Sequence, residues 1–437
     1  MKGDRDMNAR PNSGSVPPAP KPLCPIPRSG VQGPSGILLY LLLLLASATV
    51  GIGICAMRTT SEPEVQIAEV VSAAALLLLT VYLWKVTRTA RMIVPILAIA
   101  GVFLVYLTNS LIPTAVLVSL IFAVSEGSFL VAVQPKNKLA VLLTLPVLAY
   151  AATLILSRDP AGSVAALIPF PAIPVLAWGT RRSAASEDGI TRVGVICATS
   201  LALGLSLGGM ILFSVYRYVG SLDPAALTEA LEAFRENLIL QITSTEFPTE
   251  GMTPEQIAEI REMLSYANVS NTVDSCFNVL PGIAVVAVNL LAAVVQIIQH
   301  ASLRAFGFEA SITDRVKAFR MSLLSCIAFL AAYLIAMLED AAVTTLAGTV
   351  AQNIYIILMP GLALAGMLRL TSGLVSKGPQ KLGCLFYFVL LIPCFVLFAP
   401  FVFAAIEVIS HIFTSVTSAI KPPEDPDDPF GGPPESF

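Results

Sequence analysis

The stretch Ile37–Met57 reads ILLYLLLLLASATVGIGICAM and contains no charged side chain. A helix rises about 1.5 Å per residue, so a segment of this length crosses the roughly 30 Å hydrocarbon core of a bilayer. Similar stretches recur along the 437-residue chain, which is 56% hydrophobic and only 13% charged. Soluble domains carry about 25% charged residues. The composition therefore predicts a multi-pass membrane protein and excludes a soluble globular enzyme.

Eleven apolar stretches are candidate membrane spans, and we predict an all-α transmembrane helical bundle with about eleven spans (range nine to eleven). Helices are expected because unpaired backbone groups cannot face lipid. The stretches are Ile37–Met57, Ile67–Trp84, Met92–Leu107, Leu111–Val133, Leu139–Leu156, Ala161–Trp178, Val193–Tyr216, Cys276–Ile298, Met321–Leu338, Ala342–Leu368 and Leu382–Ile409.

One long polar loop divides the predicted spans into two groups. Residues 35–216 are expected to form an N-terminal bundle of about seven spans, and residues 274–412 a C-terminal bundle of about four. Residues 217–273 form the loop between them. The ends, residues 1–34 and 413–437, are rich in proline and polar residues, and they are predicted to be disordered tails.

The distribution of basic residues predicts the orientation. If the N-terminus lies in the cytoplasm, twenty of the 26 Lys and Arg residues fall on the inner side, as the positive-inside rule requires. We therefore expect a plasma-membrane protein with its N-terminus inside and its C-terminus outside. The basic inner rim suits anionic lipid head groups. The expected partners are membrane lipids, with other membrane subunits or a separate ATPase, and no nucleic acid.

The long loop carries signals for two amphipathic outer helices. Asp223 followed by Pro224 is an N-cap with proline at the first helical position. A second helix start follows at Thr253, with Gln256 at the capping-box position. These helices can be a lid, a surface that docks a partner, or a structural cap on the bundle.

Motifs that carry known chemistry are absent. The sequence has no G-x-x-x-x-G-K-[ST] phosphate loop, no H-E-x-x-H and no Cys-x-x-Cys pair. It contains only two histidines, His300 and His411, which are predicted to lie at opposite faces of the membrane. We therefore predict no metal site, no cofactor and no catalytic residues, so the protein is expected not to be an enzyme.

Polar residues inside apolar spans remain as candidates for function, because burying them in lipid is costly. Glu126 lies in Ser125-Glu126-Gly127-Ser128, which interrupts an apolar stretch. In a broken span this carboxylate can face a ligand or a proton. Alternatively, residues 111–124 form a short tilted span and Glu126 lies in the inner interface.

Asn289 and Asn353 are the other two candidate ligand-binding residues. They can line a polar cavity between helices, or they can form hydrogen bonds between helices. Glu69 lies at the predicted outer end of a span, where solvation is expected. Glu407 and His411 are four residues apart, and they can form a proton-linked pair or a solvated one.

The second half of the chain contains NVLPGIAVVAVNLLAAVVQII at residues 278–298 and VAQNIYIILMPGLALAGM at residues 350–367, separated by a basic inner stretch. This order resembles the YybS-like family of bacterial integral membrane proteins, best over about Val193–Ser376. That family brings no established activity or site residues. It is similar in general character to the substrate-binding membrane subunits of vitamin transporters, whose ATPase is a separate chain.

Two functions are consistent with these patterns. The first is a small-molecule binding or permeation component without its own ATPase, which predicts a closed polar cavity reached by Glu126, Asn289 or Asn353. The second is a membrane scaffold or assembly factor that acts through the outer helical loop and the tails.

Overall fold

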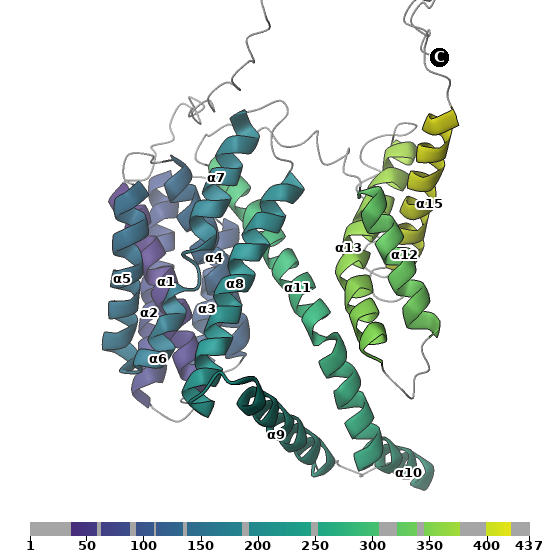
Figure 1. The fold of residues 1–437 in the computed structure, drawn as a ribbon. Helices are drawn as coiled ribbons and strands as arrows, with labels where there is room; N and C mark the ends of the chain where they lie inside the picture. Colours follow the sequence, from purple (N-terminus) through teal and green to yellow (C-terminus); the bar gives the residue numbers. More distant parts are fainter. Residues whose placement is uncertain are drawn as a thin grey trace, which may run out of the picture. The chain divides into compact units, whose positions relative to one another are not determined.

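The computed structural model describes residues 36–58, 63–87, 93–108, 111–133, 138–185, 192–245, 252–305, 321–338, 345–375 and 399–420. Every regular element in these ranges is a helix, which confirms the all-α prediction. The elements are α1 Gly36–Arg58, α2 Pro63–Thr87, α3 Ile93–Thr108, α4 Ile112–Val133, α5 Lys138–Ser157, α6 Pro160–Ser163, the 3₁₀ helix η3 Val164–Leu167, α7 Ala172–Ala185, α8 Arg192–Val219, α9 Pro224–Thr243, α10 Pro254–Met263, α11 Tyr266–Ala305, α12 Leu323–Leu338, α13 Leu346–Val375 and α15 Ala399–Ile420 (Figure 1).

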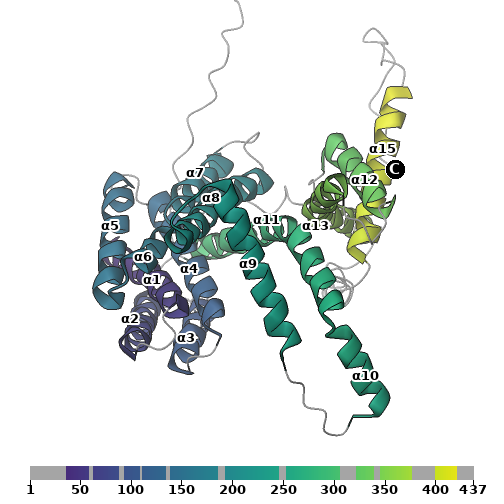
Figure 2. The ribbon, with the colours of Figure 1, turned by 60° about the horizontal axis from the view of Figure 1, so that its bottom comes forward.

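The first compact unit, unit 1, contains residues 1–241 and 287–315. Helix α1 lies at its centre and packs against α2, α4, α5 and η3 (Figure 2). Leu43 of α1, Phe129 of α4 and Ile173 of α7 are almost completely buried in one core cluster. Apart from Arg58 at its last position, α1 contains no charged residue, which suits this central position because such a helix can bury apolar side chains all round.

The expected span at Ala161–Trp178 is not one regular helix. The chain forms the short α6, the 3₁₀ helix η3 and a turn before α7 begins at Ala172. Pro169 and Pro171 explain the break, because proline has no backbone N–H to donate and its ring obstructs the preceding helical turn.

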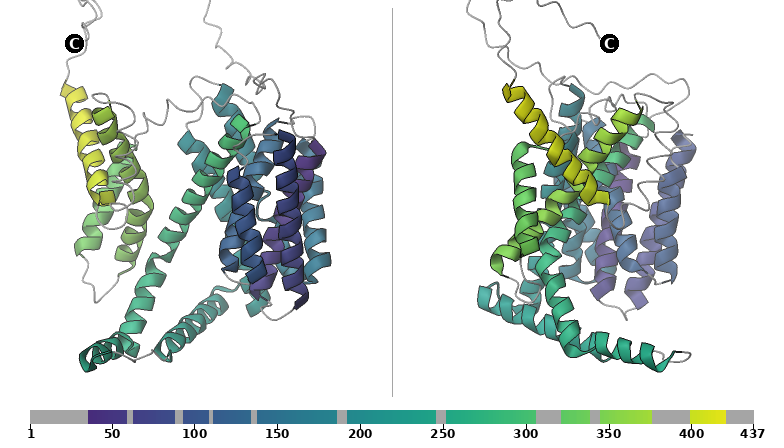
Figure 3. Two further views of the ribbon diagram at one scale, coloured as in Figure 1. Left: turned by 180° about the vertical axis from the view of Figure 1, so that it is seen from behind. Right: turned by 90° about the vertical axis from the view of Figure 1, so that its right-hand side faces the viewer.

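The second compact unit, unit 2, contains residues 242–286 and 316–437. Its helices α12, α13 and α15 pack on one another, as Figure 3 shows from two directions. Phe329 of α12, Leu362 of α13 and Val408 of α15 form the buried centre. The ring of Tyr355 on α13 stacks on Phe329 with centroids 5.4 Å apart, which adds directional packing to this centre.

These units divide the chain differently from the predicted domains. Helix α11 contributes residues 266–286 to unit 2 and residues 287–305 to unit 1, whereas the sequence placed its apolar part entirely in the C-terminal bundle. Helix α15 continues to Ile420, so the predicted disordered tail from residue 413 begins too early. The tails at residues 1–34 and 421–437 lie outside the described residues.

Seven described helical segments are long and apolar enough to cross a membrane, so the prediction of eleven spans is not confirmed. Four further apolar segments of 10–17 residues lie within α3, α5, α12 and α15: Pro95–Thr108, Leu142–Ser157, Leu323–Leu338 and Ala404–Thr414. The apolar runs of the sequence therefore recur as helices, but fewer of them meet the length and composition of a membrane span.

The exposed surfaces of the long helices are apolar. Leu78 of α2, Leu201 of α8 and Ile297 of α11 are each more than 60% exposed, and many other large apolar side chains are exposed with them. Only 28% of the candidate span in α8 is buried within the protein. Apolar surface of this extent suits contact with lipid tails rather than with water.

The last expected span, Leu382–Ile409, begins in residues outside the described part of the chain. Helix α15 covers Ala399–Ile420, and within unit 2 it runs in the same direction as α13 (Figure 1). Ile420 and Val375 therefore lie at the same end of unit 2. The orientation deduced from the sequence places the segments after these two residues on opposite sides of the membrane, and it stays a prediction.

Candidate functional site

Glu126 is buried in unit 1 and hydrogen-bonded to another helix. Its side chain is 6% exposed, and its Oε1 atom accepts a 2.7 Å hydrogen bond from the hydroxyl of Ser302 on α11. Helix α4 is continuous through Ser125–Ser128, so the predicted break in the span is wrong. The alternative of a short span that ends at residue 124 also differs from the structure, because the candidate span in α4 covers Ile112–Ala132.

Gly127 explains why the helix remains closely packed beside the carboxyl group. A Cβ atom at this position would lie 2.6 Å from Cδ1 of Ile173 on α7 and 3.0 Å from Cδ1 of Leu43 on α1. The glycine therefore permits the close approach of α1 and α7 to α4. It serves packing and does not open the backbone.

A second polar contact joins α7 and α11. The hydroxyl of Thr180 donates a 2.7 Å hydrogen bond to Oε1 of Gln299, which is completely buried. Within the described part of the chain, Nε2 of Gln299 has no hydrogen-bond partner. A buried amide donor without an acceptor is costly, and it marks a place where a bound polar group would be stabilised.

The two contacts belong to one face of α11. Gln296, Gln299 and Ser302 recur at three-residue spacing and are all buried, so they lie near one another along the helix. We call Glu126, Thr180, Gln299 and Ser302 the polar cluster. Sequence reasoning missed the last three, although the recurrence of polar residues every three positions near the end of an apolar span was a usable signal.

A basic side chain lies next to the polar cluster in sequence. Arg181 follows Thr180, and its Nε atom donates a 2.9 Å hydrogen bond to the backbone carbonyl of Ala132 near the end of α4. This bond connects the C-terminal ends of α4 and α7. The cluster itself offers a carboxyl group, hydroxyls and a carboxamide, which suit hydrogen bonding with a polar solute. Within the described residues, no group of three His, Cys, Asp or Glu side chains is placed to hold a metal ion.

Asn353 lies in unit 2 and its amide group is occupied by hydrogen bonds within the protein. Oδ1 accepts a 2.5 Å bond from the backbone N–H of Gly282, and Nδ2 donates to the carbonyl of Asn278 at 2.7 Å. Nδ2 also donates to the carbonyl of Thr349 on its own helix at 2.8 Å. These contacts join α13 to α11, so they support the structural interpretation of Asn353.

The three predicted ligand-binding residues are divided between the units, with Glu126 and Asn289 in unit 1 and Asn353 in unit 2. Asn289 is partly buried in the part of α11 that belongs to unit 1, and it lies thirteen residues before Ser302. That interval corresponds to about 20 Å along the helix. Asn353 belongs to unit 2, so only Glu126 of the three contributes to the polar cluster.

Two carboxyl groups that were expected to be solvated are buried. Glu69 on α2 is 0% exposed, and Glu407 on α15 is 1% exposed. The expectation that both carboxyl groups are solvated came from their position near the end of an apolar stretch. The helices α2 and α15 continue in both directions past these residues and pack against neighbours there, so a position near a span's end did not mean contact with water.

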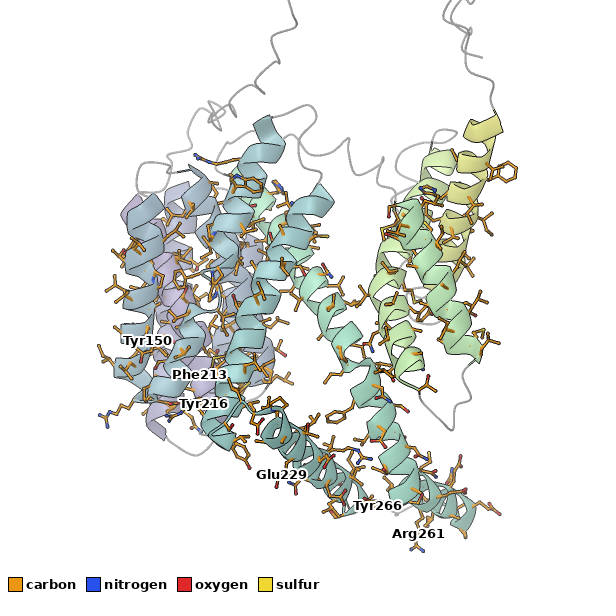
Figure 4. The ribbon with its side chains drawn as sticks, in the orientation of Figure 1. Tyr150, Phe213, Tyr216, Glu229, Arg261 and Tyr266 are labelled. Carbon is orange, nitrogen blue, oxygen red and sulfur yellow. The ribbon has the colours of Figure 1, made fainter. Side chains whose placement is uncertain are left out.

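The long polar loop after α8 contains the two predicted helices, α9 and α10. The predicted capping box at α10 is confirmed: Oγ1 of Thr253 accepts from the N–H of Gln256, and Oε1 of Gln256 accepts from the N–H of Thr253. On α9, the apolar side chains of Leu231 and Phe234 are 54% and 60% exposed. Figure 4 shows the side chains of both helices, with Glu229 and Arg261 labelled.

The fold and its apolar surfaces define a multi-pass helical membrane protein. Comparison with known protein families matches residues 188–406, half of the chain, to the family described as Predicted membrane protein (DUF2232). The chain therefore belongs to this family. No curated protein and no solved structure matches it. Gln299 and Ser302 lie inside the matched region, and Glu126 precedes it.

Proposed function

We propose that the protein is a small-molecule binding or permeation component of the membrane, without an ATPase of its own, and that the polar cluster contacts the solute. The observation that carries the proposal is the completely buried Nε2 donor of Gln299, which has no acceptor among the described residues. It lies one helical turn from the Ser302 hydroxyl that binds Glu126. Intramembrane polar groups of this kind mark substrate or ion sites in many membrane proteins.

The chemistry of the polar cluster suggests the class of solute. An acceptor atom on the solute would satisfy Nε2 of Gln299, and a hydrogen-bond donor or a positive charge would suit the carboxyl group of Glu126. A small amine or amide with a neighbouring oxygen atom has both features. The proposal includes no catalytic role for these residues, and any energy for transport would come from partner proteins or ion gradients. As part of the same proposal, we assign the chain to the YybS-like proteins.

The test is native mass spectrometry of the full chain purified in a mild detergent. We expect a reproducible non-lipid adduct on the wild-type protein, and its loss in Gln299→Met and Glu126→Gln. Ser128→Ala is the matched control, because the Ser128 hydroxyl is buried on α4 but donates only to the carbonyl of Ser125 on its own helix. An adduct that persists in both cluster variants, or no adduct in repeated wild-type preparations, would overturn the proposal.

A second function, a membrane scaffold, is favoured by one observation on α9. Leu231 and Phe234 are apolar residues three positions apart on α9, yet each is more than half exposed. A structural cap would bury these side chains against the bundle, whereas a docking surface leaves them open for a partner. The scaffold hypothesis predicts that Leu231→Ser and Phe234→Ser abolish co-purification of envelope proteins while Gln299→Met does not. The opposite pattern would argue against a scaffold.

A further inference from the structure

Helix α8 ends at a turn that separates it sharply from α9. Gly220 has φ +78°, a backbone conformation that residues with a side chain rarely adopt. Its N–H donates a 2.8 Å hydrogen bond to the carbonyl of Tyr216 and so caps the last turn of α8. The Ser221 hydroxyl accepts from the N–H of Asp223 at 3.0 Å, directly before α9 starts at Pro224. The two helices are therefore separate elements and not one bent helix.

The end of α8 carries the features of a membrane boundary. Its candidate span covers Gly194–Val219, and large apolar side chains such as Leu205 and Ile211 are exposed along it. At its end, Tyr216 and Tyr218 are 48% and 91% exposed. Tyrosine is enriched at the level of the lipid head groups, because its ring is apolar and its hydroxyl is polar. We therefore place the membrane surface near these two tyrosines.

Helix α9 begins close to this boundary. Four residues separate Val219 from Pro224, so the two positions are at most about 17 Å apart even in an extended chain. Both helices belong to unit 1 as far as Gln241. Figure 4 labels Tyr216 near the end of α8 and Glu229 on α9. The first turns of α9 therefore lie at the level of the lipid head groups.

The apolar side chains of α9 form one stripe along the helix. Their spacing of three or four residues places them on the same face. The stripe, which we call the α9 stripe, consists of Leu227, Leu231, Phe234, Leu238 and Ile242. Leu231 and Phe234 in its middle are more than half exposed, and the other three are half-buried. Exposed leucine and phenylalanine side chains are unfavourable in water but suit a lipid surface.

The opposite face of α9 is acidic. At 100° per residue, Glu229, Glu232 and Glu236 point away from the α9 stripe, and all three are exposed. Within the described part of the chain, Ile239 is the buried residue of α9, so most of the stripe is not covered by the protein. A helix with an apolar stripe on one face and charges on the other is the type that lies in a membrane interface.

We propose that α9 lies in the interface between the bilayer and water, with the α9 stripe in contact with lipid and its carboxylates in water. The occupant is lipid because the stripe continues the exposed apolar surface of α8, which itself suits lipid tails. Apolar contact accounts for the binding, since three carboxylates give no attraction to anionic head groups. This inference does not depend on a solute at the polar cluster.

The experiment measures which face of α9 is in contact with lipid. The full chain without its natural cysteines is placed in phosphatidylcholine nanodiscs, and single cysteines carry a nitrobenzoxadiazole fluorophore. Leu231→Cys and Phe234→Cys report on the α9 stripe, and Glu229→Cys on the opposite face is the matched control. Leu212→Cys on α8, which is 52% exposed, reports a position within the span. Because these side chains are exposed, the substitutions leave the packed core intact.

Two quenchers separate lipid from water, namely a phosphatidylcholine with a nitroxide near its head group and iodide in solution. An apolar face enters the head-group region by about 5–10 Å, so the nitroxide lipid should quench the two stripe labels at least about twofold more than the label at Glu229. Iodide should give the reverse order. Equal quenching of both faces by the lipid would overturn the proposal. So would stripe labels that neither quencher reaches, because a protein partner or the bundle would then cover the stripe.

Discussion

Asn353 on α13 accepts a 2.5 Å hydrogen bond from the backbone N–H of Gly282 on α11, and Gly282 leaves the space that this amide occupies. In a regular helix the N–H of Gly282 would bond to the carbonyl of Asn278, four residues earlier. The Asn353 amide bonds to both groups. It does so beside Pro281, which has no N–H to donate. The asparagine thus binds α11 where proline weakens its backbone.

Gly282→Ala should destabilise unit 2. The new Cβ would lie 2.8 Å from Oδ1 of Asn353 and 3.3 Å from its backbone, so the asparagine must move and lose its bonds to α11. We expect a loss of about 2 kcal/mol in the free energy of unfolding. Equilibrium unfolding in mixed micelles measures this change. Gly208→Ala on α8 is the control, because its Cβ would meet nothing within 4 Å.

The double variant tests whether the two residues act together. In the Asn353→Ala background the obstructing amide is gone, so Gly282→Ala should cost at least 1 kcal/mol less than it does alone, roughly the size of the coupling between contacting residues. Additive effects would mean that the glycine and the asparagine serve unrelated purposes.

Ser302→Ala should destabilise the contact between α4 and α11. It removes the hydroxyl that donates to buried Glu126 and leaves Oε1 without that bond. Hydrogen bonds between membrane helices are worth about 0.6–2 kcal/mol, so we expect a loss of about 1–2 kcal/mol in the free energy of unfolding. Ser128→Ala loses only a bond within α4, and it should cost less than half as much. Equal losses in the two serine variants would contradict a specific role for the Ser302 bond.

The sequence was sufficient to predict most of the helices, but not which helices pack against one another. Nine of the eleven predicted apolar runs fall on observed helices, because a run of about twenty apolar residues has few alternatives in lipid. Burial of Glu69 was not predictable, since it depends on the helices that pack against α2. The spacing of apolar residues predicts which face of a helix is buried. It does not predict which other helix packs against that face.

The candidate site, too, could be predicted from the sequence only in part. Glu126 was recognised because a carboxylate stands out in an apolar stretch, but its partner Ser302 lies 176 residues away in sequence. Asn353 was equally conspicuous, and its hydrogen bonds turned out to be internal to the protein. A polar residue within a span therefore predicts that a partner is present, while only the structure tells whether the partner is backbone, side chain or solute.

Thr253→Ala should loosen α10 without affecting the rest of the fold. The substitution removes the side-chain acceptor for the N–H of Gln256 and with it half of the capping box. Loss of such a cap costs about 1 kcal/mol. Hydrogen exchange at the first amides of α10 should accelerate by about fivefold, while exchange in α4 stays unchanged. Thr253→Ser keeps the acceptor and serves as the control, and acceleration in that variant too would rule out the cap as the cause.

The direction of α15 gives a test of membrane topology. Helices α13 and α15 run in the same direction in unit 2, so the residues directly after them, Ser376 and Lys421, should face the same side of the membrane. Single cysteines at these two positions, in a chain without its natural cysteines, should react with a membrane-impermeant thiol reagent from one side only. If the basic residues set the orientation, that side is the cytoplasm, and a cysteine at Ser221 in the outer loop should react from the opposite side. Reaction of Ser376→Cys and Lys421→Cys from opposite sides would instead restore the outside C-terminus that the alternation of spans predicted.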